Sequence, residues 1–149
     1  MSGPGGDRDI GGFSIDTRTL RAGDLFIAIR GDRFDGHTFV VESARKGAVG
    51  ALVSDPALTG VPELGSMPLI VVPDTIAALQ RLANMVRRDS GAAVVAVTGS
   101  AGKSTTKEIT ADFLESRYRV FRSRGNLNNH IGLPLSLLEL RAKPDIGVF

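Results

Sequence analysis

Residues 93–107 read AVVAVTGSAGKSTTK, and this stretch decides the fold class. Residues 93–98 are apolar on both alternating faces, as expected of a buried parallel strand. A glycine-rich loop follows, and after it we expect a helix over residues 104–115. Glycines let backbone N–H groups approach an anion closely, and the start of a helix adds its positive dipole end. Strand, loop and helix in this order therefore predict a binding site for nucleotide phosphates.

The loop residues have separate expected roles. Lys103 is expected to reach the β- and γ-phosphates as the catalytic residue, and the Ser104 hydroxyl to ligate Mg²⁺. The loop has the short form G-x-x-G-K-S, because Val97 stands where the general pattern has its first glycine. A glycine turn with a surface lysine is the alternative, and the strand–loop–helix frame argues against it. The residues expected to bind the nucleotide are Gly99, Ser100, Ala101, Gly102, Lys103, Ser104 and Thr105.

The rest of the chain alternates apolar β-rich runs with helical patterns, which predicts an α/β fold with mainly parallel sheets. Either Asp74 or Thr75 can cap the longest predicted helix. The predicted strands are 24–29, 49–54, 69–72, 119–122 and 145–149, and the other predicted helices are about 39–47, 74–90 and 134–140.

Residues 1–12 are rich in glycine and contain a proline, and we expect them to be a flexible arm. The remainder divides into residues 13–90 and 91–149, since a second block of strand and helix patterns begins there. The sequence ends inside an apolar strand, whereas open sheets of this type carry several more strand–helix units. We therefore expect a truncated chain.

Composition excludes several classes of protein. The 149 residues include no cysteine and two histidines, which excludes a disulfide scaffold and thiolate chemistry and leaves too few ligands for a protein-only metal cage. No apolar run approaches the roughly 20 residues of a membrane span and no signal peptide opens the chain, so we expect a cytoplasmic protein. The net charge of +2 lacks the clustered excess of nucleic-acid binders. The arginine cluster is expected to be a solvated strand face, with anion binding as the alternative; it comprises Arg117, Arg119, Arg122 and Arg124.

Four segments resemble the Mur ligase family, the ATP-dependent enzymes that build the peptide stem of peptidoglycan. The phosphate loop, with three hydroxyl residues after its lysine, is one of them. The segments keep the family's order and spacing over about residues 13–149. The other three segments are residues 14–28 (SIDTR, then RAGDLFIA from residue 21), 31–39 (GDRFDGHTF) and 125–135 (GNLNNHIGLPL).

The resemblance implies an amide-forming ligase that uses ATP and Mg²⁺. ATP would phosphorylate the terminal carboxylate of UDP-N-acetylmuramoyl-tripeptide, and the amine of D-alanyl-D-alanine would attack the acyl phosphate. Residues 106–108 (TKE) and 125–135 resemble the corresponding segments of the enzymes that add this dipeptide. They resemble those of the enzymes that add meso-diaminopimelate or lysine less. The implied architecture is a small amino-terminal α/β substrate domain, residues 13–90, followed by the first part of a P-loop-type central ATPase domain, residues 91–149.

The resemblance also implies that one group of residues lies near the uridine and diphosphate of the muramoyl substrate. Two simpler roles remain open: Arg18 could pair with Asp16 to stabilise a turn, and His37 could cap or pack the helix that follows it. The implied uridine and diphosphate residues are Thr17, Arg18, Asp35, Gly36 and His37.

Three asparagines, Asn126, Asn128 and Asn129, would by the same resemblance face the substrate beside the γ-phosphate. An Asx turn is their structural alternative. Lys107 and Glu108 are expected on the surface of the helix after the phosphate loop.

Three hypotheses differ in what the whole chain does. The first is that the chain is a fragment of an amide-forming ligase. Full-length family members carry the remainder of the central domain and a carboxy-terminal domain, so we expect this chain alone not to catalyse ligation. A short non-catalytic module that binds a nucleotide or a UDP-sugar is the second hypothesis. A small P-loop phosphotransferase is the third, but its one candidate acid, Asp145, stands at the start of a strand, whereas ligands gather at carboxyl ends.

Overall fold

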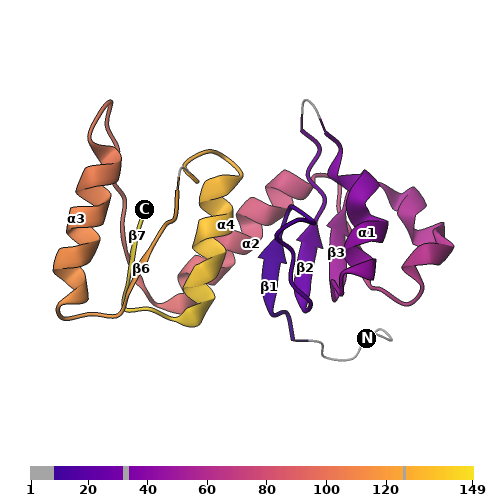
Figure 1. The fold of residues 1–149 in the computed structure, drawn as a ribbon, viewed down its shortest axis with the longest axis horizontal. Helices are drawn as coiled ribbons and strands as arrows, with labels where there is room; N and C mark the ends of the chain where they lie inside the picture. Colours follow the sequence, from indigo (N-terminus) through magenta and orange to yellow (C-terminus); the bar gives the residue numbers. More distant parts are fainter. Residues whose placement is uncertain (1–8, 32–33, 126) are drawn as a thin grey trace. The chain divides into compact units, whose positions relative to one another are not determined.

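The computed structural model describes residues 9–31, 34–125 and 127–149 and contains two parallel β-sheets. The chain divides into two compact units, Met1–Ala78 and Leu79–Phe149, with one sheet in each (Figure 1). Every strand pair in both sheets is parallel. The predicted α/β fold with mainly parallel sheets is therefore confirmed.

The first unit is built on a four-stranded sheet in which the strands follow the order of the chain. Phe13 lies opposite Leu25, and Phe26 lies opposite Ala51. The strands are β1 (Gly12–Ser14), β2 (Asp24–Ile27), β3 (Gly50–Val53) and β4 (Leu69–Val71). The helical segments are the 3₁₀ turns Gly36–Phe39, Pro56–Gly60 and Pro62–Leu64 and the helix α1 (Val40–Arg45).

The two central strands, β2 and β3, are buried on both faces, and a core cluster lies on one of these faces. Phe26 of β2 and Ala28, which follows β2, are two residues apart and therefore point to the same face. There they pack with Ala51 and Val53 of β3 and Val40 of α1. Fully burying a large apolar side chain stabilises the fold by about 1.5–3 kcal/mol. The carboxyl ends of β2 and β3, where the site loops begin, are therefore firmly held.

The longest helix, α2 (Thr75–Ser90), agrees with the predicted helix over residues 74–90. The Asp74 carboxylate accepts the N–H groups of Ile76 and Ala77, as expected of a cap. The helix begins in the first unit and continues into the second. The domain boundary between residues 90 and 91 stays a prediction.

The second unit contains a three-stranded sheet in the order β5-β7-β6. In Figure 1, α3 and α4 lie on opposite sides of these strands. No helix in the described ranges is long and apolar enough to cross a membrane. The elements are β5 (Ala93–Val95), α3 (Lys103–Glu115), β6 (Val120–Arg122), α4 (Gly132–Leu138), the 3₁₀ turn Glu139–Ala142 and β7 (Ile146–Val148).

Two local predictions about this unit are wrong. The predicted buried strand, β5, is largely exposed, with 38% of Val94 accessible, because the described elements leave its faces partly uncovered. The predicted strand face with Arg117 and Arg119 does not form. Arg117 lies in the turn after α3, where its N–H donates to the Leu114 carbonyl, and β6 begins only at Val120.

Part of the predicted arm over residues 1–12 is tied to the first sheet. Gly12 is the first residue of β1 and pairs with Asp24, and the Gly11 N–H donates to the Gly23 carbonyl at 2.8 Å. The prediction of an arm is therefore wrong for Gly11 and Gly12. Residues 1–8 lie outside the described residues.

Candidate functional site

A cavity of about 270 Å³ opens at the carboxyl edge of the second sheet. Because all three strands are parallel, the segments that follow them meet there, and ligands of open α/β sheets bind at this edge. The lining comes from the segments after β5, β6 and β7 and from α3 and α4. It includes Thr98, Lys103, Ser104, Lys107, Ser123 and Asn128.

The predicted phosphate loop joins β5 to α3 beside this cavity. Gly102 precedes the helix with a left-handed φ of 74°, and a Cβ there would have nothing within 4 Å. The backbone angle, and not lack of space, therefore requires glycine. Among the described residues no side chain caps α3, and its first turn contains no acidic residue. The first N–H groups and the positive end of the helix are thus available to an anion.

Lys103 and Ser104 lie where an anion at this helix end would be held. The Lys103 ammonium donates to the Gly99 carbonyl, with 2.6 Å between Nζ and O, which folds the side chain across the loop. Ser104 also lines the cavity, whereas Thr105 is exposed and does not. The loop residues Gly99, Ser100, Ala101 and Gly102 are exposed.

A hydroxyl oxygen is a ligand type that Mg²⁺ accepts when phosphate oxygens and water complete its shell. In the described ranges no three His, Asp or Glu side chains cluster as a metal site of their own. The Ser104 hydroxyl beside an anion site fits a magnesium ion that arrives with a nucleotide.

Lys107 is buried, and its predicted surface position is wrong. Its side chain lines the cavity, and its ammonium donates to the Ser123 carbonyl and lies 3.2 Å from the Glu108 carboxylate. Lys107 follows Lys103 by one helical turn, so the two lysines share a face of α3. That four-residue spacing is the sequence signal that could have found it.

The asparagine segment divides into different structural roles. Asn128 is exposed and lines the cavity. The Asn129 carboxamide oxygen accepts the N–H groups of Ile131 and Gly132, at 3.1 and 2.7 Å, which is the Asx-type turn considered as an alternative. Asn126 lies outside the described residues.

Arg122 belongs to an ion-pair network and is not free to hold a ligand anion. Its guanidinium lies 2.9 Å from Glu108, 2.8 Å from Asp112 and 2.6 Å from Glu115, all on α3. Hydrogen bonds, first from Arg122 and then from Lys107, lower the pKa of Glu108 below its ordinary value. The network fixes β6 to α3.

Asp145 lies before the start of β7, at the amino edge of the sheet and not at the carboxyl edge with the cavity. It accepts the backbone N–H and the guanidinium of Arg119, at 2.8 and 3.1 Å. These bonds lower its pKa, the backbone bond most. The position argues against Asp145 as the metal ligand of a small phosphotransferase.

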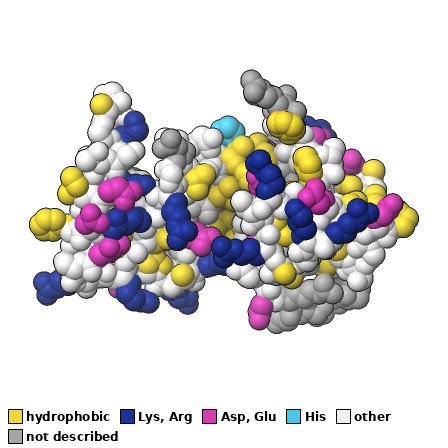
Figure 2. Space-filling model, in the orientation of Figure 1, with side chains coloured by type: hydrophobic (Ala, Val, Ile, Leu, Met, Phe, Trp, Pro, Cys, Tyr) yellow, Lys and Arg dark blue, Asp and Glu magenta, His cyan; other side chains and the backbone are white. Residues whose placement is uncertain are grey.

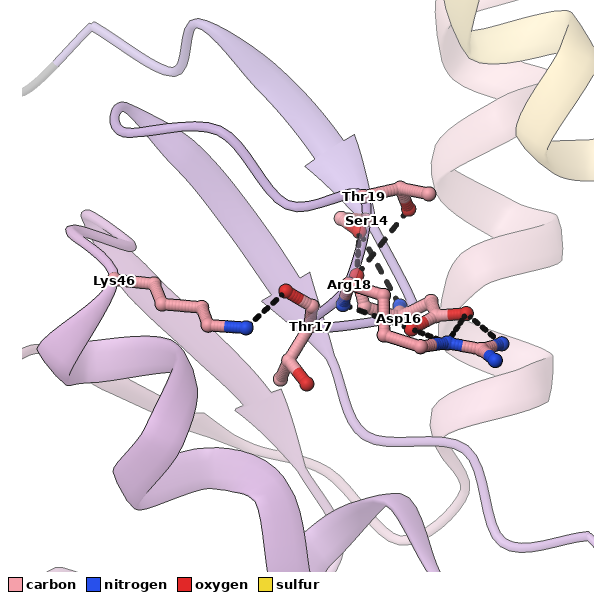
Figure 3. Close-up of polar contacts among 6 residues, drawn as sticks. All are labelled: Ser14, Asp16, Thr17, Arg18, Thr19 and Lys46. Carbon is pink, nitrogen blue, oxygen red and sulfur yellow. Dashed lines mark hydrogen bonds and ion pairs between the residues drawn. The ribbon is translucent and has the colours of Figure 1, made fainter.

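In the first unit, residues after β1 form a compact polar turn (Figure 3). The Asp16 carboxylate receives the Arg18 Nε at 2.9 Å and the Arg18 backbone N–H at 2.9 Å. The side-chain bond is the main reason that the pKa of Asp16 falls from 3.8 to about 2. The turn-stabilising pair considered for Asp16 and Arg18 is therefore present, although the Arg18 side chain stays 86% exposed.

Thr17 is buried in the same turn and connects it to α1. Its carbonyl accepts the Lys46 ammonium at 2.8 Å, as Figure 3 shows. Lys46 and Glu42 also pair with each other at 2.8 Å. Thr17 thus has a structural role, and Arg18 is the residue of the turn that reaches solvent.

His37 joins two loops at the carboxyl edge of the first sheet. Its Nε2 accepts the Ser54 backbone N–H at 2.8 Å, so the ring proton lies on Nδ1 and is donated to Asp35 at 2.6 Å. The His37 backbone N–H, and then its ring, lowers the pKa of Asp35 to about 2. Both ring nitrogens are used, which agrees with the packing alternative for His37.

Gly36 lies where the backbone passes close to the end of β2. A Cβ at this position would stand 2.7 Å from the Ile29 nitrogen and 3.1 Å from the Ala28 Cα. The Gly36 N–H donates to the Ile29 carbonyl at 2.8 Å. Only glycine allows this close approach, which places Asp35 and His37 at the sheet edge.

Two family models match this chain. Residues 9–87, more than half of the chain, match the Mur ligase family, catalytic domain. Residues 97–149 match the Mur ligase middle domain. The chain belongs to the Mur ligase family. The predicted resemblance is thus confirmed, and it extends over both units of this Mur ligase chain.

Named relatives agree with one branch of the family. The UDP-N-acetylmuramoyl-tripeptide–D-alanyl-D-alanine ligase of Bacillus subtilis is 44% identical over 139 residues, which cover 93% of this chain and 30% of the relative. The ligase of the same name from Escherichia coli is 41% identical over 144 residues, which cover 97% of this chain and 30% of that relative. The Mur ligase chain therefore spans about 30% of the length of these curated relatives.

Solved structures show the same likeness in three dimensions. The UDP-N-acetylmuramoylalanyl-D-glutamyl-2,6-diaminopimelate–D-alanyl-D-alanyl ligase of Acinetobacter baumannii has a TM-score of 0.81 at 37% identity, covering 94% of this chain and 30% of that one. The MurF ligase of Thermotoga maritima in complex with ADP has a TM-score of 0.79 at 36% identity, and the match covers 95% of this chain and 32% of that one.

Proposed function

We propose that this Mur ligase chain belongs to an enzyme that joins D-alanyl-D-alanine to UDP-N-acetylmuramoyl-tripeptide with ATP. The names of the Bacillus and Escherichia relatives support this branch of the family. The observation that carries the nucleotide part is the uncapped start of α3, with Lys103 and Ser104 at one cavity. ATP as the co-substrate favours a cytoplasmic reaction.

In the proposed reaction the terminal carboxylate of the tripeptide attacks the γ-phosphorus of ATP, and ADP leaves. The amine of D-alanyl-D-alanine then attacks the acyl carbon and gives up a proton to solvent. The bond to phosphate breaks as the amide bond forms, and phosphate is released. Lys103 neutralises charge on the transferring phosphoryl group, and the loop N–H groups orient it. Mg²⁺, held with the help of Ser104, supplies further charge neutralisation when bound. Asn128, in the segment after β6, lines the same cavity and faces the substrate there.

The first unit is proposed to hold the uridine and diphosphate of the muramoyl substrate. Arg18 is exposed and supplies a cation for the diphosphate, although its present pairing with Asp16 must loosen first. Asp35, Gly36 and His37 act mainly by fixing the shape of their loop, since their polar atoms already bond within it.

The chain is proposed to bind nucleotide without completing ligation, because it spans about 30% of the length of its relatives. Calorimetry with Mg-ATP tests the site, with Lys103→Met as the variant and Lys143→Met, an exposed lysine, as its control. We expect binding by the wild type and by Lys143→Met, and at least about a tenfold loss for Lys103→Met. Equal affinity of all three proteins would refute the assigned site.

The catalytic part of the proposal is tested separately. Release of phosphate from ATP is measured with UDP-N-acetylmuramoyl-tripeptide and D-alanyl-D-alanine present. We expect no release above background. Turnover by the purified chain would show that these residues suffice for catalysis.

A further inference from the structure

Lys107 is a buried charge in the second unit that the proposed phosphate chemistry does not use. It is 8% exposed, and in the described part of this unit no other charged side chain is buried. Burying an ammonium is unfavourable unless hydrogen bonds and opposite charge compensate for the lost water. The residue lines the same cavity as Lys103 and Ser104, so its partners decide what it contributes there.

The main partner of Lys107 is the backbone. Its Nζ donates to the Ser123 carbonyl, whereas the Ser123 hydroxyl is 3.5 Å away, at the limit of hydrogen bonding. The Glu108 carboxylate, at 3.2 Å, supplies the opposite charge. Ser123 is the first residue after β6, so this bond fixes the point at which the chain leaves the strand.

The segment after Ser123 is held at both of its ends. At its start, the Ser123 N–H donates to the Val148 carbonyl at 2.9 Å, in addition to the Lys107 bond. At its end, the Asn129 carboxamide oxygen accepts the N–H groups of Ile131 and Gly132, at the start of α4. Between these anchors lies Asn128, which borders the cavity.

We propose that Lys107 is a positioning residue that sets the asparagine loop, defined as Gly125, Leu127 and Asn128, against the phosphate loop. Lys103 and Lys107 are one turn apart on a single helix, so α3 carries both the phosphate contact and the anchor of the neighbouring loop. Movement of the phosphate loop is thereby coupled to movement of the asparagine loop. The ADP measurement below rests on the proposed function, but the loop measurement does not.

The first test is the order of the asparagine loop, measured by ¹⁵N relaxation of the whole chain without nucleotide. The variant is Lys107→Met, which keeps most of the apolar stem and removes the ammonium. We expect order parameters of Gly125, Leu127 and Asn128 to fall from about 0.85 to below about 0.6. Lys143→Met should leave them unchanged, and so should Ser123→Ala, because it keeps the carbonyl.

The second test uses ADP as the probe. In the wild type, ADP should shift the side-chain amide signal of Asn128. In Lys107→Met, ADP affinity should fall by less than about tenfold because Lys103 remains, but the Asn128 shift should disappear. Unchanged loop order together with a wild-type Asn128 response in Lys107→Met would overturn the proposal.

Two further outcomes keep the tests decisive. If the wild type binds no ADP, the proposed nucleotide function fails, while the relaxation comparison still decides the role of Lys107. If Lys107→Met does not fold, the ¹⁵Nζ signal of Lys107 in the wild type decides instead. A slowly exchanging, hydrogen-bonded ammonium supports the anchor, and one in rapid exchange with water refutes it.

Discussion

At the scale of single residues, the pair of Asp16 and Arg18 makes the turn after β1 sensitive to acid. The folded pKa of Asp16 is about 2 against an ordinary 3.8, so the carboxylate stabilises the fold above about pH 4. This contribution is lost as the pH falls from about 4 to 2. Because Arg18 is exposed, solvent screening keeps the contribution of this pair to stability small.

We predict that Arg18→Ala raises the pKa of Asp16 toward 3.8, because the main cause of its lowering is the Arg18 side chain. The remaining backbone N–H bond keeps it somewhat below that value. Carboxyl ¹³C signals followed between pH 6 and 2 measure the change. Asp35 is the internal control, since its pKa of about 2 depends on His37 and should not move. An unchanged Asp16 titration would contradict the prediction.

At the scale of elements, the turn from the phosphate loop into α3 depends on one left-handed glycine. Replacing Gly102 by alanine forces a Cβ into φ of 74°, which costs about 1–2 kcal/mol although the space is empty. If the backbone instead changes its angle, the first N–H groups of α3 no longer converge. We predict that Gly102→Ala lowers both the unfolding free energy and the affinity for ADP.

Gly91→Ala is the matched control for this element. Gly91 has a φ of 70° and likewise has nothing within 4 Å of a Cβ, but it lies before β5 and outside the cavity lining. Chemical denaturation should show a similar loss of stability, and calorimetry should show unchanged ADP affinity. Equal loss of ADP affinity in both variants would mean that general strain, and not the loop geometry, is responsible.

At the scale of the whole molecule, a low net charge is combined with exposed apolar side chains. The net charge is +2, which gives little electrostatic repulsion between copies. On α3, Ile109 and Phe113 are 58% and 82% exposed on neighbouring turns, and Figure 2 shows hydrophobic side chains protruding there. Contiguous exposed apolar surface promotes association.

We predict that the chain self-associates as its concentration rises and that Phe113→Lys weakens the association at least about tenfold. Sedimentation velocity over a range of concentrations measures the effect. Met85→Lys is the control, because Met85 is 60% exposed but lies on α2. Identical sedimentation of Phe113→Lys and the wild type would locate any association elsewhere.

Much of the fold follows from local patterns. The helix over residues 74–90, its Asp74 cap and the strand–loop–helix frame of the phosphate site depend on near neighbours in the sequence, and the structure contains them. The prediction that β5 is buried failed because burial depends on which elements cover a strand, and apolar composition alone does not contain that information.

The sequence alone determined the Mur ligase resemblance, the parallel α/β class and the position of the phosphate loop, because glycine angles, helix periodicity and motif order are local properties. Only the tertiary structure decided that Lys107 is buried and that His37 is fully bonded. Their partners, Ser123 and Ser54, are 16 and 17 residues away along the chain. Parallel strands brought those partners within hydrogen-bond distance at the sheet edges, where burial made each bond necessary.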